Sequence, residues 1–278
     1  MKTALIQLTS SNDPAANLRK VEALIRTASA GGAKFVLTPE TTNIISASRK
    51  HQVAVLHTED KDPMLDHLRK LAYALDIWLL IGSLALKTSD ADGRFANRSF
   101  LIAPNGKIQA RYDKIHMFDV DLGGGEVYRE SAAYRPGSSA TLAKASIGNI
   151  GMTICYDMRF PGLFRMLAQG GAEILTVPAA FTLPTGRAHW HALLRARAIE
   201  TGCFVLAPAQ VGTHDDGGNP RRQTYGHSLA ISPWGQVLAD GGETEGVTFV
   251  DIDLNEVVRA REKIPSLDHD REFQPPEV

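Results

Sequence analysis

The stretch "GMTICYDMRFPG" (Gly151–Gly162) places a cysteine at the end of an apolar run, followed at once by Tyr-Asp and then a proline turn. Cysteines that serve as core residues usually lie inside apolar surroundings, whereas Cys155 stands where the apolar run stops. The pattern predicts a strand that turns sharply into a helix beginning at Pro161. Such a turn can present a nucleophile above a sheet edge, near unpaired backbone N–H groups. At this point both a core cysteine and a presented thiol remain open.

Short apolar runs alternate with helical periodicities on both sides of this stretch. We expect strands at "TALIQL", "FVLTPE", "IWLLIGS", "IGNIGMTIC", "EILTVPAAF", "FVLAPAQ" and "GVTFVDIDL",. Helices are expected over 14–31, 64–75, 161–171 and 188–202, and near the C-terminus. Two hairpins are expected over 97–114 and 225–239, and Asn105-Gly106 in the first is typical of a type I′ turn. This mixture indicates a layered α/β sandwich, and without linkers or repeats we expect a single domain over residues 1–278.

Composition narrows the possible functions and the cellular location. A formal net charge of -1 without long runs of like charge argues against a nucleic-acid surface,. Two cysteines cannot form a disulfide framework and suit a reducing compartment,, and we interpret Cys203 as a core residue. The N-terminal segment lacks the features of a signal peptide, and no apolar run approaches the ~20 residues of a membrane helix. We therefore expect a cytoplasmic protein without membrane contact.

Two charged residues fall at expected strand ends, as Cys155 does. A thiol is mostly protonated at neutral pH, so a catalytic cysteine needs a base or a nearby cation. Glu40 closes "FVLTPE" after a proline, and Lys114 closes "QARYDK" before an apolar segment. Each alone is typical of a solvated charge, but three such residues at three strand ends indicate a shared site. His189 and His191 point to different faces of a helix, so we expect no metal there.

The chain resembles the nitrilase superfamily of carbon-nitrogen hydrolases. "PE" at Pro39-Glu40, "YDKIHMFD" around Lys114 and "GMTICYDMRFP" around Cys155 are similar to its three catalytic boxes. The resemblance implies a four-layer αββα sandwich and association through helices, hence a homodimer or a larger even-numbered homo-oligomer. It assigns Glu40 as general base, Lys114 as stabiliser of the tetrahedral intermediate and Cys155 as nucleophile.

The loop after the lysine box supplies a further residue in this family. Glu130 in "YRES" occupies the position of a glutamate that orients the other groups, with Glu126 a weaker alternative. The resemblance then implies attack of the thiol on an amide, an oxyanion met by Lys114 and the Tyr156 backbone N–H, and a thioester that water hydrolyses. No metal or organic cofactor is required. The glycines at 123–125 indicate a loop beside the site rather than a phosphate cradle.

The substrate is expected to be a small carboxylated amide. "PAAFTLPTGRAHWHALLRARAIETG" and "YGHSLAISPWGQVLA" most resemble the branch of deaminated glutathione amidases, with the omega-amidases acting on 2-oxoglutaramate as runner-up. A nitrilase and a non-catalytic binding or scaffold member are further alternatives. Candidate substrate contacts are Phe181, Thr182, Arg187 and Arg159. A capped turn explains the residues at 181–187 equally well, and Arg159 with Asp157 also fits a turn and ion-pair system under the cysteine.

Overall fold

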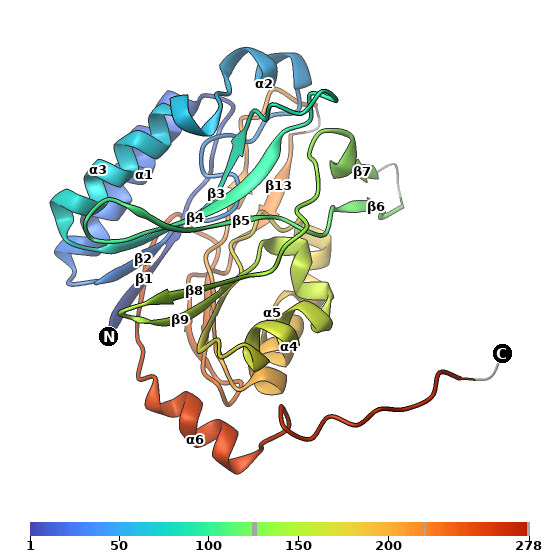
Figure 1. Cartoon of the computed structure of the whole chain (residues 1–278). Coiled ribbons are helices and arrows are strands. Elements are labelled where there is room, and N and C mark those ends of the chain that lie inside the picture. Colours follow the sequence, from blue (N-terminus) through green and yellow to red (C-terminus); the bar gives the residue numbers. More distant parts are fainter. Residues whose placement is uncertain (124–126, 220, 277–278) are drawn as a thin grey trace.

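The structure is a computed structural model that describes residues 1–123, 127–219 and 221–276 (Figure 1). Two six-stranded sheets pack against each other, and helices lie on their outer sides. The layers therefore run helix, sheet, sheet, helix. Among the described residues, no helix combines the length and the apolar character needed to cross a membrane.

The first sheet has the strand order β16-β1-β2-β3-β4-β5. Its strands are β1 (Lys2–Gln7), β2 (Phe35–Leu37), β3 (Trp78–Leu86), β4 (Ala96–Ile102), β5 (Ile108–Asp113) and β16 (Gly246–Asp251). Strands β1, β2 and β3 are parallel, and the flanking pairs are antiparallel. Helices α1 (Pro14–Ala30) and α3 (Pro63–Leu75) pack on its outer face. The short helices α2 (Arg49–Val55) and η1 (Glu59–Lys61) lie between β2 and α3.

The second sheet has the order β15-β14-β11-β10-β9-β8. Its strands are β8 (Thr141–Ala145), β9 (Gly148–Met152), β10 (Ile174–Thr176), β11 (Phe204–Ala207), β14 (Leu229–Ile231) and β15 (Val237–Asp240). Helices α4 (Pro161–Gln169) and α5 (Leu183–Thr201) cover it. The remaining elements are β6 (Asp119–Asp121), β7 (Val127–Arg129), η2 (Glu130–Ala132), η3 (Cys155–Arg159), β12 (Val211–Thr213), β13 (Gln223–Tyr225) and α6 (Asn255–Lys263).

Alternation along the strands creates two separate cores. In β1, Leu5 belongs to the core shared by the two sheets, whereas Ala4 and Ile6 belong to the core under α1 and α3. Successive side chains of a strand point to opposite faces, so an uninterrupted apolar run indicates a strand that is covered on both sides. The continuous apolar character of "TALIQL" therefore reflects a central strand of a layered sheet.

The first hairpin differs from the predicted type I′ turn. Such a turn requires positive φ at both Asn105 and Gly106, but only Gly106 has it, with φ of 75°. Gly106 N–H donates to the Ala103 carbonyl at 2.8 Å and Ala103 N–H to the Lys107 carbonyl at 2.9 Å. Proline at 104 fixes a negative φ of about -65° at the first turn position. The hairpin therefore closes through a longer loop with the glycine alone in the left-handed region.

Helix α5 begins earlier than predicted. The sequence predicts its start at Ala188, after a capped turn over residues 181–187. The structure starts the helix at Leu183, with Thr182 as N-cap residue and the proline in the first turn. Proline is favoured there because its missing N–H needs no partner and its φ already suits a helix.

Candidate active site

Cys155 opens the 3-10 helix η3 directly after the strand β9 and its short extension. Its φ of 49° lies in the left-handed region, which is uncommon for a residue with a side chain,. Its N–H donates to the Pro178 carbonyl at 3.0 Å, and the residue is 7% exposed. The structure therefore confirms the sharp turn that the sequence predicts after the strand. The Tyr156 N–H follows in the first turn of η3, where backbone N–H groups lack partners within the helix,.

Asp157 anchors this turn from below. Its Oδ2 accepts hydrogen bonds from Ile154 N–H at 2.8 Å and from the Tyr112 hydroxyl at 2.7 Å. Its Oδ1 accepts from His116 N–H at 3.0 Å and lies 2.7 Å from His116 Nδ1. The carboxylate is completely buried. A turn system under the cysteine is present, but the side-chain partners of Asp157 are His116 and Tyr112 and not Arg159.

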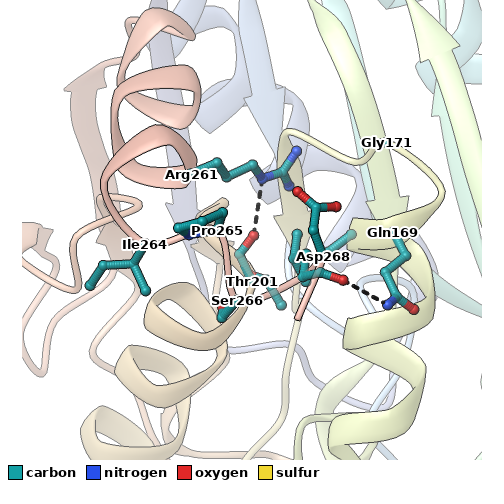
Figure 2. A pocket seen from close by; sticks show the side chains of 11 residues that line it. Gln169, Gly171, Thr201, Arg261, Ile264, Pro265, Ser266 and Asp268 are labelled. Carbon is teal, nitrogen blue, oxygen red and sulfur yellow. Dashed lines mark hydrogen bonds between the residues drawn. The ribbon is translucent and has the colours of Figure 1, made fainter. Parts of the chain in front are cut away.

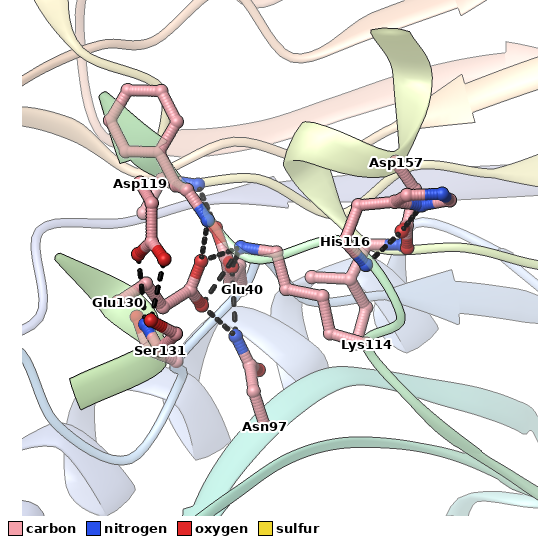
Figure 3. Close-up of polar contacts among 12 residues, drawn as sticks. Glu40, Asn97, Lys114, His116, Asp119, Glu130, Ser131 and Asp157 are labelled. Atoms are coloured by element: carbon pink, nitrogen blue, oxygen red, sulfur yellow. Dashed lines mark hydrogen bonds and ion pairs between the residues drawn. The ribbon is translucent and has the colours of Figure 1, made fainter. Parts of the chain in front are cut away.

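Lys114 lies between two carboxylates beside this turn (Figure 3). Its Nζ is 2.9 Å from Glu40 Oε1 and 2.9 and 2.8 Å from the two oxygens of Glu130. Asn97 of β4 adds a bridge, because its Nδ2 donates to Glu40 Oε1 at 2.9 Å and to Glu130 Oε1 at 3.3 Å. Glu40, Lys114 and Asn97 are buried. The structure thus brings together three of the predicted site residues.

Backbone groups fix the second oxygen of Glu40. Ala180 N–H donates to Glu40 Oε2 at 2.8 Å, and Gln210 Nε2 donates to the Glu40 carbonyl at 3.0 Å. The next residue, Thr41, has a φ of 49° and donates its N–H to Ser83 Oγ at 2.7 Å. Glu40 therefore precedes a backbone position in the left-handed region, whereas Cys155 itself occupies one. A carboxylate held at both oxygens and at its backbone has a fixed orientation toward its neighbours.

The charges of the cluster determine its protonation. Burial alone would raise the pKa of Glu40, but the charge and hydrogen bond of Lys114, together with smaller effects of Arg222 and Cys155, lower this pKa overall,. Burial likewise opposes the charge of Lys114, but Glu130 and Glu40 raise its pKa well above the usual value. Burial, followed by the negative charge of Glu40, raises the pKa of the Cys155 thiol, while Lys114 lowers it by less. These shifts favour an ionised Glu40–Lys114 pair beside a protonated Cys155 thiol at neutral pH.

The predicted substrate contacts lie in different environments. The Arg159 guanidinium is 5.5 Å from the centre of the Phe181 ring, so these two residues are brought together. Thr182 is buried, and its hydroxyl is 2.7 Å from that of Thr185, which fits the alternative of a turn leading into a helix. Arg187 is exposed on α5. No hydrogen bond or ion pair between described residues joins Arg187 to the cluster of Glu40.

Sequence reasoning missed two residues near the cluster. Asn97 lies inside a strand, where no motif separates it from an ordinary polar residue. Arg222 precedes β13, and its Nη2 donates to the Ala180 carbonyl at 2.8 Å. Its position in a polar, glycine-containing segment gave no signal. Glu126 and the glycines at 124 and 125 lie outside the described residues.

A separate cavity of about 450 Å³ lies under the segment after α6 (Figure 2). Arg261 reaches into it and donates to the Thr201 carbonyl at 3.2 Å. The same guanidinium lies 3.1 Å from Cys203 Sγ. Cys203 is fully buried, which confirms it as a core residue. Its neighbours in the sequence do not reveal its contact with the Arg261 cation. This cavity contains none of the predicted site residues.

One group of side chains within the described ranges has the spacing of metal ligands: His191, His227 and Asp240. Asp240 lies 3.2 Å from His191 Nε2 and 2.9 Å from His227 Nδ1. These contacts already partner the carboxylate. His189 instead contacts Arg159 at 3.1 Å, so His189 and His191 have different partners, as their spacing indicates.

Comparison with known proteins places this arrangement in a family. The carbon-nitrogen hydrolase family model matches residues 2–262. A deaminated glutathione amidase of Yersinia enterocolitica is 40% identical over 272 residues, covering 96% of this chain and 92% of that protein. The chain therefore belongs to the carbon-nitrogen hydrolase family, whose members hydrolyse carbon–nitrogen bonds.

Solved structures define the fold. The NitFhit protein of Caenorhabditis elegans superimposes with a TM-score of 0.88 at 37% identity, over 97% of this chain and 65% of that one. Nit3 of Saccharomyces cerevisiae, described as a member of branch 10 of the nitrilase superfamily, gives a TM-score of 0.83 at 28% identity, over 95% and 94%. The expected αββα sandwich of the nitrilase type is confirmed.

Proposed function

We propose that the protein is a cofactor-independent amidase that hydrolyses deaminated glutathione through a thioester on Cys155. The observation that carries this proposal is the ion cluster in which Lys114 lies 2.8 to 2.9 Å from Glu40 and Glu130, beside a thiol on a left-handed turn. The activity named for the Yersinia relative supports the choice of substrate.

The first half of the reaction forms the thioester. Glu40 takes the proton of the Cys155 thiol as sulfur attacks the amide carbonyl carbon and the carbonyl electron pair moves to oxygen. Lys114 and the Tyr156 N–H stabilise that oxyanion. When the electron pair returns, the carbon–nitrogen bond breaks and Glu40 gives its proton to the departing nitrogen. Glu130 keeps the ammonium group of Lys114 in place.

The second half releases the acid. Glu40 removes a proton from a water molecule, whose oxygen attacks the thioester carbonyl carbon. The same two donors stabilise the second oxyanion. Its collapse breaks the carbon–sulfur bond, and the thiolate of Cys155 recovers the proton from Glu40. The fixed orientation of the Glu40 carboxylate suits these repeated transfers, because one group must reach the sulfur, the leaving nitrogen and the water.

Arg159 is the best-placed of the predicted cations for the acid end of the substrate. It lies four positions after Cys155, and its guanidinium stands 5.9 Å from the centre of the Tyr156 ring and 5.5 Å from that of Phe181. Charge-assisted hydrogen bonds from arginine suit a carboxylate beside a ketone. Thr182 is a weaker candidate because its hydroxyl already pairs with Thr185.

The ratio of kcat/KM for deaminated glutathione and 2-oxoglutaramate tests this function. We expect the larger substrate to be preferred, and simple nitriles to be hydrolysed poorly. A preference for 2-oxoglutaramate would make the protein an omega-amidase. Hydrolysis of nitriles with neither amide accepted would contradict the proposal. A protein that binds these amides without releasing any product would be the non-catalytic alternative.

A further inference from the structure

A second cation, Arg222, lies near the Glu40 oxygen that Lys114 does not contact. Ala180 connects the two, since its N–H donates to Glu40 Oε2 and its carbonyl accepts from Arg222 Nη2, both at 2.8 Å. Electrostatics agree with this closeness. Burial opposes the ionised form of Glu40, Lys114 supplies the main effect that lowers its pKa, and Arg222 lowers it further. Only Ala180 thus separates Arg222 from Glu40, the proposed base, in space.

The guanidinium of Arg222 lacks the acidic partner that an arginine in such a place usually has. Its Nε is buried without a hydrogen-bond partner. Across the described residues, no carboxylate lies within ion-pair distance of it, whereas Arg98 pairs with both Asp113 and Glu59. Buried donors are almost always satisfied in folded proteins. An unpaired guanidinium beside a catalytic cluster is therefore a position that a bound anion would complete.

The segment that carries Arg222 is held firmly by polar contacts. His214 lies within hydrogen-bonding distance of the Ser10 carbonyl at 2.8 Å and of Thr224 Oγ1 at 2.7 Å. Asp216 Oδ2 accepts the Arg222 N–H at 3.1 Å, and His214 N–H donates to the Arg222 carbonyl at 2.9 Å. A preformed cation binds an anionic group without the cost of ordering a loop.

The proposed mechanism indicates which part of the substrate lies on the side of Arg222. Glu40 delivers the proton to the departing nitrogen, so the amine part of the substrate must leave beside Glu40. Arg222 lies on that side, beyond Ala180. Arg159 belongs to η3, the element that starts with the nucleophile, and so lies nearer the acyl part. In this scheme Arg159 lies on the acyl side of the scissile bond and Arg222 on the amine side.

We propose that Arg222 binds the carboxylate at the far end of the amine part of the substrate, the tail that distinguishes deaminated glutathione from 2-oxoglutaramate. This assignment rests on the proposed function and deepens it. Arg159 serves the acid of the acyl part, and Arg222 makes the enzyme select amides whose nitrogen carries an acidic tail. Arg222 is a specificity residue in this scheme and takes no part in proton transfer.

A cycle of two substrates and three proteins, extended by the charge-conserving variant Arg222→Lys, tests the assignment. The substrates are deaminated glutathione and its C-terminal amide, which lacks only the tail charge. The proteins are the unmodified enzyme, Arg222→Gln and, as a matched control, Arg221→Gln, whose exposed arginine lies 3.4 Å from Asp215. We expect the unmodified enzyme and the control to prefer the carboxylate by about 10–100-fold in kcat/KM, mainly through KM. Arg222→Gln should lose this preference, and Arg222→Lys, which keeps the charge, should retain part of it.

The outcomes separate this assignment from the proposed function. If Arg222→Gln and Arg222→Lys slow both substrates by one common factor, the arginine acts only through the cluster, and the assignment is wrong while the amidase stands. If Arg221→Gln abolishes the preference as well, the effect is a general one of surface charge and the assignment again fails. If the unmodified enzyme hydrolyses neither compound, the proposed function is wrong and this assignment falls with it.

Discussion

The two six-stranded sheets share one topology. In each, three central parallel strands are flanked by one antiparallel strand on one side and by an antiparallel pair on the other. Even the hairpin turns agree: Gly106 and Gly235 have φ of 75° and 82°, and each N–H donates to the residue three positions earlier. A comparison of equivalent positions in the two sheets therefore shows where one sheet carries a reactive side chain and the other an inert one.

The nucleophile stands at one of these equivalent positions. In the first sheet the last pair between β1 and β2 involves Leu5, and in the second the last pair between β9 and β10 involves Met152. Three residues beyond these pairs lie Leu8 and Cys155. Leu8 is fully buried in the core under α1 and α3. The first sheet therefore has an inert side chain where the second has a thiol.

For the general base the distribution is reversed, because the reactive residue belongs to the first sheet. The partners of those residues are Leu37 in β2 and Thr176 in β10, and three positions later lie Glu40 and Ala179. A proline precedes each of them. The second sheet thus has an alanine where the first has the carboxylate. Each sheet supplies one reactive group, and neither sheet alone holds both.

The antiparallel pairs extend the pattern. Lys114 N–H donates to the Asn97 carbonyl at 3.0 Å after β5, and Gly241 N–H donates to the Ser228 carbonyl at 2.9 Å after β15. The second sheet therefore has glycine and serine where the first has lysine and asparagine. The first sheet supplies the charges and the second the sulfur, so the site forms only when their ends meet.

The largest effect is expected at the sulfur. Cys155→Ser should lower turnover roughly 10⁴-fold or more, because a hydroxyl is far harder to ionise than a thiol. Cys203→Ser is the matched control, since this buried cysteine lies away from the cluster and serine keeps its polar contact with the Ala172 carbonyl. Mass spectrometry after iodoacetamide should find Cys155 labelled before Cys203. Equal labelling, with activity retained in Cys155→Ser, would show that the second sheet carries no nucleophile.

A somewhat smaller effect is expected when the first sheet loses its cation. Lys114→Met removes an oxyanion donor and should lower kcat by about 10²–10³-fold. It also removes the charge that keeps the pKa of Glu40 below the ordinary 4.5. Glu40 acts as a carboxylate, so the acid limb of kcat/KM should lie below pH 4.5 in the unmodified enzyme. In the variant burial dominates, the pKa rises, and the limb should move to higher pH.

The pH profiles of the unmodified enzyme and Lys114→Met can contradict this prediction. An acid limb at the same pH in both proteins would mean that Lys114 does not control the protonation of Glu40. Glu130→Gln provides a graded control, because it removes one negative charge from the cluster and weakens the contacts that hold the Lys114 ammonium group, but retains the lysine itself. Its loss of activity should come mainly from a misplaced ammonium group.

Sequence alone could predict the residues that terminate strands. Glu40, Lys114 and Cys155 each close an expected strand, and the ends of neighbouring strands meet, so their pattern carries spatial information,. The alternation of runs likewise predicted the central strands and the helices over them. The same sequence predicts assembly as an even-numbered homo-oligomer through the helix 188–202, and this stays a prediction.

Positions defined by tertiary contacts could not be predicted in this way. Asn97 gains its role from two carboxylates 57 and 33 residues away along the chain. Arg222 gains its role through Ala180, 42 residues away. Contacts between residues so far apart along the chain produce no local sequence pattern. The shared plan of the two sheets was also invisible as a repeat, because it lies in strand pairing and not in residue identity.

Asn97 and Ser228 allow an intermediate test of the comparison. Asn97→Ala should lower kcat about 10–100-fold with little change in KM, because Glu40 and Glu130 lose a shared donor and the base is less well oriented. The acid limb should also move to higher pH, since a hydrogen bond to the ionised carboxylate is lost. A purely structural asparagine would leave that limb in place.

Ser228→Ala is the matched control for Asn97→Ala. The Ser228 hydroxyl accepts the Ala209 N–H at 2.9 Å, and its loss leaves a buried donor unpaired, at a cost of about 1–3 kcal/mol of stability. Because no reactive group lies at this place in the second sheet, the pH profile should stay that of the unmodified enzyme. A shifted profile in Ser228→Ala would remove the distinction between the two positions.

The smallest effect is expected at the hairpin turns, where the two sheets should respond alike. Gly106→Ala and Gly235→Ala each place a side chain at positive φ, which costs about 1–2 kcal/mol. An added Cβ would lie 3.1 Å from the Arg69 carbonyl oxygen in the first case and 2.5 Å from an Ile199 side-chain carbon in the second. Ile199 is 55% exposed and can move aside, so the two losses, measured by urea denaturation, should agree within about 1 kcal/mol. Both variants should keep full kcat, because the turns lie at the strand ends away from the cluster. A fall in kcat for Gly106→Ala alone would mean that the first sheet transmits strain along β4 and β5 to Asn97 and Lys114, and that its frame differs from that of the second sheet in more than its side chains.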